Sequence, residues 1–180
     1  MVQRANRRLR DERGAGLIEF ALILPIVIML LVGIVSAAGA YQKDLSLSNG
    51  AREGARYAAT LPVANFTTVT PLNSWLDDVA NTAVHAVDDG LPAGVSGRDV
   101  CVAYVYPNGT DPNDRTTRRD EDASGTVTYS QATCFTDSRP VTERRVQVLL
   151  KRNVSLDAYL FKTTVTLTGK SVARFEAIAG

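Results

Sequence analysis

Residues 13–40 read RGAGLIEFALILPIVIMLLVGIVSAAGA, and this stretch decides the fold. From Phe20 to Ala40 there are 21 residues without a charged side chain. A helix that spans the hydrocarbon core of a membrane needs about 20 such residues, at a rise of about 1.5 Å per residue. The sequence therefore predicts one membrane-spanning helix near the N-terminus of this 180-residue chain.

The charges that precede the apolar stretch predict its orientation. Residues 1–14 hold five arginines against one aspartate and one glutamate, a net charge of +3 (5 − 2). Because positive residues beside a span favour the cytoplasmic side, we expect residues 1–14 inside and everything after Tyr41 outside the membrane. The whole chain has a net charge of only +1, which gives no reason to expect nucleic-acid binding.

A secretory signal peptide is the rival interpretation of the apolar stretch. Ala38-Gly39-Ala40 fits the small-x-small cleavage rule, and a cut there would release everything after the span. However, the apolar segment is longer than the usual core of about 7 to 15 residues, and Glu19 interrupts its start. We therefore expect the mature protein to keep the helix.

The helical pattern continues beyond the span. We expect one helix from Leu17 to Thr60, about 66 Å long at about 1.5 Å per residue. Pro25 lacks an N–H group, so it should kink this helix within the membrane. Pro62 should end it, because the residue before a proline disfavours the helical conformation.

The chain then divides into a basic leader (1–14), a membrane helix that continues into the ectodomain (15–60) and an extracytoplasmic domain (61–180). Apolar residues at helical spacing, then runs of β-branched and aromatic residues, predict the elements of that domain. They are a helix over 74–88, a polar loop over 107–125 and strands over 100–106, 126–129, 145–151 and 163–174. Helices followed by three or four antiparallel strands indicate an α+β fold, with the second helix packed on a small sheet.

Small residues recur in the outer half of the long helix. Gly50 and Gly54 lie four residues apart, as do Ala51 and Ala55, and this spacing lets two backbones approach closely. Each glycine would weaken an isolated helix by about 1 kcal/mol, which favours a packing role. The alternative is an exposed helix with solvated charges such as Arg52.

The two cysteines, Cys101 and Cys134, predict one disulfide if the domain lies in an oxidising compartment. The bond would close a loop of about 34 residues and stabilise the fold by roughly 3 to 4 kcal/mol in the chain-entropy model. The alternative is a pair of buried free thiols. The chain has no CxxC motif, so we expect no zinc site.

Nothing in the sequence marks a catalytic site or a cofactor. Five acidic residues gather near the polar loop: Asp111, Asp114, Asp120, Glu121 and Asp122. Their spacing does not fit a calcium loop, because Arg115 stands where a ligand should be, and we expect a solvated loop. His85 is the only histidine, and no nucleophile accompanies it. Gly169-Lys170-Ser171 imitates the end of a P-loop, but Thr164 replaces the earlier glycine.

The start of the apolar helix carries the most informative motif. Gly14 and Ala15 follow the basic leader, and Glu19 and Phe20 stand at the edge of the span. A carboxylate there is costly unless it is paired. A cut after Gly14 would make the amine of Ala15 a cation within one helical turn, on the same chain or a neighbour. The alternative is an unpaired carboxylate that reaches the headgroups.

This motif, continued through Leu24-Pro25 and followed by residues 51–59, resembles the TadE-like family. These proteins are minor pilins or pseudopilins of Flp-type, type IVb tight-adherence pilus systems. The resemblance is strong over residues 13–59 and looser in the strands over 146–150 and 164–176. The chain departs from the family's pattern at residues 42–44, Gln-Lys-Asp, where a more apolar or Arg-containing segment is expected.

The resemblance implies that a prepilin peptidase cleaves after Gly14 and that the chain is a substrate, not an enzyme. It further implies that the N-terminal helix packs with other pilins at an assembly platform in the cell membrane. We therefore expect a structural pilus subunit. The alternative, from another class, is an uncleaved bitopic or a secreted extracytoplasmic binding module.

Overall fold

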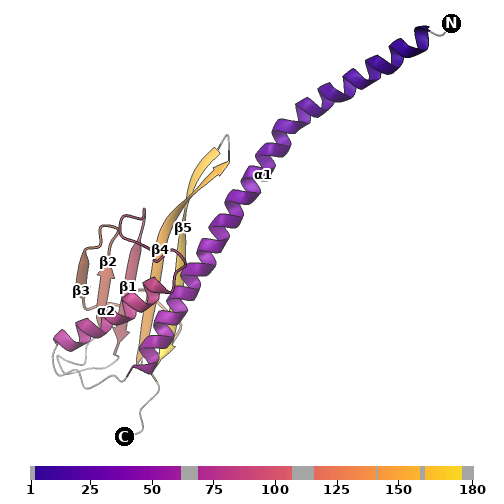
Figure 1. Cartoon of the computed structure of the whole chain (residues 1–180). Coiled ribbons are helices and arrows are strands. Elements are labelled where there is room, and N and C mark those ends of the chain that lie inside the picture. Colours follow the sequence, from indigo (N-terminus) through magenta and orange to yellow (C-terminus); the bar gives the residue numbers. More distant parts are fainter. Residues whose placement is uncertain (1–2, 62–68, 107–115, 141, 159–160, 176–180) are drawn as a thin grey trace. The chain divides into compact units, whose positions relative to one another are not determined.

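The computed structural model describes residues 3–61, 69–106, 116–140, 142–158 and 161–175. Two helices precede five strands (Figure 1). The elements are α1 (Gln3–Thr60), α2 (Val69–His85), β1 (Asp99–Val105), β2 (Thr117–Glu121), β3 (Val127–Ser130), β4 (Arg145–Ala158) and β5 (Phe161–Arg174). The strands form one sheet in the order β3-β2-β1-β4-β5. This architecture confirms the predicted α+β, pilin-like fold.

The chain forms two compact units. One contains Met1–Ala40 with Ser155–Thr163, and the other contains Tyr41–Val154 with Thr164–Gly180. Helix α1 contributes to both units. It begins at Gln3, upstream of the expected start at Leu17, and Pro25 lies within it without ending it. The helix ends at Thr60, two residues before Pro62, as expected.

Strand β1 lies at the centre of the sheet and is buried on both faces. It pairs antiparallel with β2 and with β4, so that Val102 faces Arg119 on one side and Val148 on the other. Every residue of β1 after Asp99 is buried. This explains why the sequence after Asp99, Val-Cys-Val-Ala-Tyr-Val, does not alternate between apolar and charged residues as a half-exposed strand would.

The hydrophobic core lies between one face of the sheet and the two helices. Alternate residues of β1 and β4 face it, and they meet the buried sides of α2 and of the outer half of α1. The central members are Leu47, Ala51, Ala55 and Ala58 of α1, Leu76, Val79 and Ala83 of α2, and Val100, Val102, Val146, Val148 and Leu150 of the sheet. The apolar positions of residues 47–58 therefore serve the core of this domain.

Glycines bring α1 into backbone contact with its neighbours. A methyl group added to Gly54 would lie 2.5 Å from Ala83 Cβ of α2, and one added to Gly50 would lie 2.7 Å from the Ala83 main-chain oxygen. On β5, a methyl group at Gly169 would lie 2.3 Å from the main-chain oxygen of Leu47. These distances are below any real Cβ contact, so no larger residue fits without a shift.

Strand β2 corrects the expected polar loop over 107–125. Its sequence, Thr-Arg-Arg-Asp-Glu, shows no strand pattern, and the strand pairs with β1 and β3 and forms ion pairs with Asp77 of α2 and with Arg98. Arg119 Nε donates to Asp77 Oδ1 of α2 at 2.6 Å, and Arg119 Nη2 donates to Glu121 Oε2 at 2.9 Å. Arg98 Nη2 donates to the other oxygen of Glu121 at 2.7 Å. The guanidinium groups of Arg98 and Arg119 are almost fully buried.

Helix α2 and the C-terminal strands also differ from expectation. Helix α2 runs from Val69 to His85 instead of the expected 74–88, so Ser74 lies inside it. Pro71 is the third residue of the helix, where its missing N–H group costs no hydrogen bond. Strand β4 ends at Ala158 instead of residue 151, and β5 begins at Phe161 instead of residue 163. The two strands are neighbours in the sheet and form a long hairpin.

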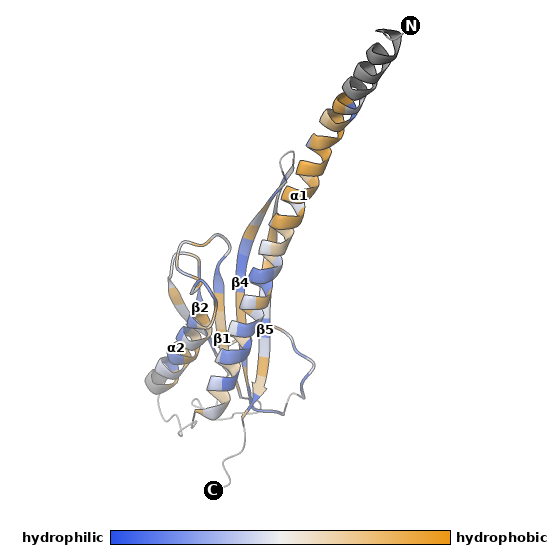
Figure 2. Cartoon of the chain, turned by 45° about the vertical axis from the view of Figure 1, so that its right-hand side comes forward, coloured by the Kyte–Doolittle hydropathy of each residue, from blue (hydrophilic) through white to orange (hydrophobic). Residues whose placement is uncertain are grey.

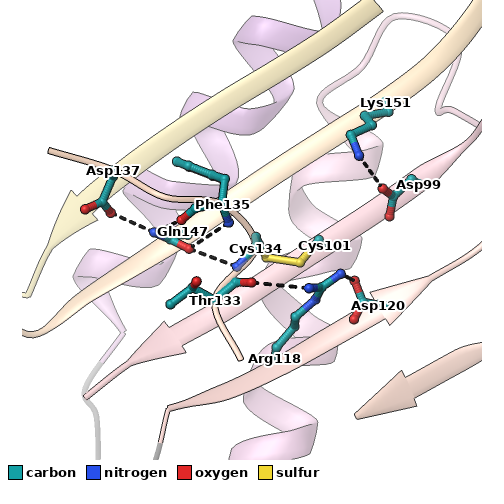
Figure 3. Close-up of a disulfide and its surroundings, with 10 residues drawn as sticks. All are labelled: Asp99, Cys101, Arg118, Asp120, Thr133, Cys134, Phe135, Asp137, Gln147 and Lys151. Atoms are coloured by element: carbon teal, nitrogen blue, oxygen red, sulfur yellow. Dashed lines mark hydrogen bonds and ion pairs between the residues drawn. A yellow bond between two sulfur atoms is a disulfide. The ribbon is translucent and has the colours of Figure 1, made fainter. Parts of the chain in front are cut away.

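The second face of the sheet is closed by the disulfide between Cys101 of β1 and Cys134 (Figure 3). The segment after Cys134 is bound by Gln147, a fully buried side chain of β4. Gln147 Oε1 accepts the main-chain N–H groups of Cys134 (3.0 Å) and Phe135 (3.4 Å). Gln147 Nε2 donates to the main-chain oxygen of Phe135 (2.9 Å) and to Asp137 Oδ2 (2.7 Å). All four hydrogen-bonding positions of this amide are therefore used.

Asp137 joins this cluster through a buried ion pair. Its Oδ2 also accepts from Arg145 Nε at 2.8 Å, and both side chains are less than 9% exposed. Burial disfavours the carboxylate, but the hydrogen bonds from Gln147 and Arg145 outweigh it, and the pKa of Asp137 lies below its ordinary value. The cluster thus needs the ionised form of Asp137.

Substitution of Gly54 tests the contact between the helices. Gly54→Ala should lower the free energy of unfolding by up to about 2 kcal/mol, because overpacking costs about 1 to 3 kcal/mol while alanine regains about 1 kcal/mol of helix propensity. Denaturant unfolding of the full chain in micelles measures this change. Gly39→Ala is the matched control, because no atom lies within 4 Å of the added methyl group, and it should not destabilise.

A double-mutant cycle separates steric conflict from other causes. Ala83→Gly removes the methyl group that a new side chain at position 54 would meet. This substitution should therefore cost less in the Gly54→Ala background than in the native chain. Strictly additive effects would show that the two helices do not meet at these residues.

Substitution of Asp137 tests the buried ion pair. Asp137→Asn should lower the free energy of unfolding by about 3 kcal/mol at neutral pH, because Arg145 loses its counter-charge inside the protein. Since the native carboxyl has a lowered pKa, its stabilisation is complete above the unfolded pKa of about 3.9 and disappears as the pH falls further. The difference between the two proteins should therefore shrink below about pH 4.

Asp120→Asn is the control for that experiment. Asp120 pairs with Arg118, but both side chains are more than 20% exposed. Its loss should cost less than about 1 kcal/mol. Equal effects of the two substitutions, at every pH, would contradict the assigned role of Asp137.

Candidate functional site: the N-terminal helix

The motif of the sequence lies within α1. Gly14 and Ala15 are in the helix, although the structure does not describe their side chains. Glu19 and Phe20 are exposed, with 62% of Phe20 accessible. Of the residues that the structure describes, none forms an ion pair or a hydrogen bond with Glu19. In a helix, positions 15 and 19 are one turn apart on the same face, which places any charge at residue 15 beside this carboxylate.

The apolar part of α1 is exposed along its length. Every large hydrophobic side chain between Leu17 and Val35, Met29 excepted, is among the exposed ones. Figure 2 shows the helix as strongly hydrophobic there and mixed further along. Over the described residues, one helix is long and apolar enough to cross a membrane, within Gly16–Thr60. The fold thus presents a single N-terminal helix that a bilayer or other apolar helices must cover.

The four small residues of the predicted packing set lie on the side of α1 that faces the domain. Gly50, Ala51, Gly54 and Ala55 are all buried. Gly50 and Gly54 face α2 of the same chain, and Ala51 and Ala55 belong to its core. Their environment is therefore within the subunit. The opposite side of this part of α1 carries exposed charges, including Arg52 and Arg56.

The acidic residues and the histidine that the sequence offered as candidates do not form a functional site among the described residues. Asp111 and Asp114 lie outside the described residues. Asp122 Oδ1 accepts hydrogen bonds from the hydroxyl and N–H group of Ser124 and from the N–H group of Thr126, and these lower the pKa of Asp122. His85 is exposed at the end of α2. Within the part of the chain that the structure describes, no three His, Cys, Asp or Glu residues are arranged to hold a metal ion.

The sequence did not identify the residues that contact α1 most closely. Ala83 of α2 and Gly169 of β5 set the closest approaches to the helix. A glycine inside a strand pattern is the available signal, because it often marks the approach of another backbone. Gly169 stood in the P-loop-like triplet, and the structure places that triplet within β5.

Comparison with known proteins bears on the N-terminal part of the chain. Residues 14–56 match a family described as TadE-like protein. No curated protein and no solved structure matches the chain. The match covers the Gly14 motif, the exposed apolar helix and the glycines that contact α2, and it ends before the sheet. Over residues 14–56, this chain is therefore similar to TadE-like proteins.

Proposed function

We propose that this protein is a structural minor pilin or pseudopilin of an Flp/Tad-type pilus or a related secretion apparatus. The observation that carries the proposal is that the two parts of α1 lie in different environments. The first part of the helix exposes its apolar side chains, and residues 47–58 of the same helix form part of a folded core. A pilin needs both parts: an exposed apolar part that anchors the subunit and packs against other helices, and a buried part that joins the anchor to the folded domain. The TadE-like match over residues 14–56 supports the same function.

The orientation of the anchor follows from the charges beside it. The five arginines of residues 1–14 favour the cytoplasmic side. The sheet domain then lies outside the membrane, where a disulfide between Cys101 and Cys134 is stable.

Processing after Gly14 is the step that would prepare the chain for assembly. A prepilin peptidase would leave Ala15 with a free amine and remove the leader. In the uncut chain, position 15 carries a neutral amide, so Glu19 has no cation one turn away. After the cut, the amine of Ala15, on the same or a neighbouring chain, can pair with Glu19. Pairing with a neighbour would fix the axial stagger between packed helices.

The partners implied are other pilins, the prepilin peptidase and a membrane assembly platform. The exposed helix can leave lipid for a bundle of similar helices, because apolar helices gain packing contacts there without losing an apolar environment. In this proposal, Gly14 and Ala15 are substrate positions, and the protein itself catalyses no reaction and binds no cofactor or nucleic acid.

The N-terminus of the native protein tests the proposal. N-terminal sequencing and intact mass, measured on protein from native membranes, should show a chain that begins at Ala15. Gly14→Val should prevent this cut, because the peptidase must accept a small residue before the bond. Gly16→Val, two residues beyond, is the matched control and should be processed normally, since nothing lies within 4 Å of a methyl group there.

Two other results would replace the proposal. A chain that begins at Tyr41 would be a secreted protein, cut at Ala38-Gly39-Ala40, and would have no anchor. A chain that still begins at Met1 would be a bitopic protein, and its domain would act as an extracytoplasmic binding module.

A further inference from the structure

Strand β3 forms one edge of the sheet, and all of its residues are exposed (Figure 1). It pairs with β2 on one side, and no other described strand pairs with it. No residue of β3 belongs to the hydrophobic core. The strand is therefore held in place although it buries no apolar side chain, so the stability of the domain does not account for it.

The register of the β2–β3 pair shows which main-chain groups of β3 are already used. The Asp122 N–H group donates to the main-chain oxygen of Thr126 at 3.2 Å, so these two residues form a hydrogen-bonded pair. In an antiparallel ladder, such pairs recur at every second residue. Thr128 and Ser130 therefore direct their N–H and C=O groups toward β2.

The intervening residues of β3, Val127 and Tyr129, direct their N–H and C=O groups the other way, to the open edge. Each residue contributes one donor and one acceptor there. No hydrogen bond among the described residues uses these groups. The side chains of Val127 and Tyr129 are also 37% and 40% exposed. The edge thus presents unpaired main-chain groups beside accessible apolar surface.

This edge lacks most of the features that protect edge strands. Natural proteins shield such strands with charged side chains, prolines, bulges or a very short length. Residues 126–131 read Thr-Val-Thr-Tyr-Ser-Gln, without a charge or a proline. The register with β2 is continuous along the strand, so no bulge interrupts it. Only the short length of β3 limits pairing, and the edge is open to one short extended segment.

The edge is fixed in position before any partner arrives. Hydrogen bonds to Asp122 Oδ1 close the turn that precedes β3. Within the strand, the Tyr129 hydroxyl donates to Asp77 Oδ1 of α2 at 2.9 Å. After the strand, the disulfide between Cys101 and Cys134 ties the chain to β1. A segment that pairs with β3 therefore need not order this strand first, which favours binding.

We propose that the outer edge of β3 is a docking site for an extended segment of another protein, which joins the sheet as a further strand beside Val127 and Tyr129. Only an extended polypeptide repeats an N–H and a C=O group at every second residue, about 6.8 Å apart. A lipid, a glycan or a nucleic acid would leave these groups unmatched. The site does not depend on cleavage after Gly14, so it stands or falls separately from the proposed processing.

The side chains around the edge define the chemistry of the segment. Tyr129 lies on the face that carries α2, because it reaches Asp77, and Val127 shares that face. The segment needs β-branched or aromatic residues on this side. Thr128 and Ser130 lie on the other face and suit small polar residues. The Asp77 side chain is 40% exposed, so a lysine or arginine near Tyr129 would complement its charge.

Hydrogen exchange of single amides in the full chain, in micelles, tests the assigned edge. In the free protein, the amides of Val127 and Tyr129 should exchange several-fold faster than those of Thr128 and Ser130, because only the latter donate within the sheet. Equal exchange at all four amides would overturn the assignment. Protection of Val127 and Tyr129 that rises with the concentration of the chain would also overturn the proposal, in favour of a second copy as the occupant.

A synthetic peptide tests the docking itself. The probe is Lys-Thr-Val-Thr-Val-Thr with blocked ends, which has the required alternation and one cation. Its addition should slow exchange at Val127 and Tyr129 several-fold, because both amides gain acceptors. Nonspecific adhesion would not protect these two amides selectively. Binding that leaves them fast, or no binding at about 1 mM peptide, would overturn the proposal.

Substitution of Val127 separates main-chain pairing from side-chain contact. Val127→Pro removes an outward N–H group and no bond to β2, since an edge strand tolerates proline at such a position. It should weaken binding of the probe roughly tenfold, whereas the control Val127→Thr keeps the N–H group and should change the affinity less than about twofold. Equal affinities of the three proteins, with the Thr128 amide still slow, would overturn the proposal. The amide protection in the unsubstituted chain tests the same contact without any variant.

Discussion

The structure depends on the backbone contact between the outer half of α1 and the rest of the domain. Gly50 and Gly54 leave no room for a side chain against α2, and Gly169 leaves none against the Leu47 carbonyl. Glycine inside a helix or a strand weakens that element. Its presence at all three positions indicates that close approach contributes more than it costs. The contact makes residues 47–58 of the anchor helix part of the hydrophobic core.

This constraint has a mechanical consequence. A helix that merely tethered a domain could be replaced by any linker of the same length. Here the helix supplies Leu47, Ala51, Ala55 and Ala58 to the core. An axial force on α1 therefore acts directly on α2 and on strand β5. The second face of the sheet is closed by other means, the disulfide and the fully used amide of Gln147, and does not rely on α1. The two faces are thus held by different interactions.

The sequence predicted those elements that are determined by residues close together in the chain. The uncharged run from Phe20 to Ala40 predicted the apolar helix, and the β-branched and aromatic residues over 100–106 predicted strand β1. Two cysteines sufficed to predict one disulfide. Strand β2 was missed because its pairing with β1 and its ion pairs, such as Arg119 with Asp77, join residues distant in sequence. Helix α2 was expected to begin at residue 74, yet it includes Pro71, because the first turn of a helix accepts proline.

The candidate site could likewise be predicted only where it depends on residues close together in the sequence. The spacing from Gly14 to Glu19 is a local pattern, so sequence alone could identify it and the structure adds only that both residues lie in α1. What receives the helix could not be predicted, because Ala83 and Gly169 act through tertiary contact. The bond from Ser36 to the Asp157 carbonyl joins residues far apart in the chain and involves a main-chain acceptor, which no side-chain pattern records.

Native-state hydrogen exchange tests most directly the claim that α1 is part of the folded core. In the full chain in micelles, the amides of residues 47–58 should exchange as slowly as those of Val102 and Val148, through the same global opening. Gly54→Ala should speed all of them equally. Faster exchange at residues 47–58 than in the sheet, unchanged by Gly54→Ala, would show that the outer half of α1 is a tether and would contradict this account.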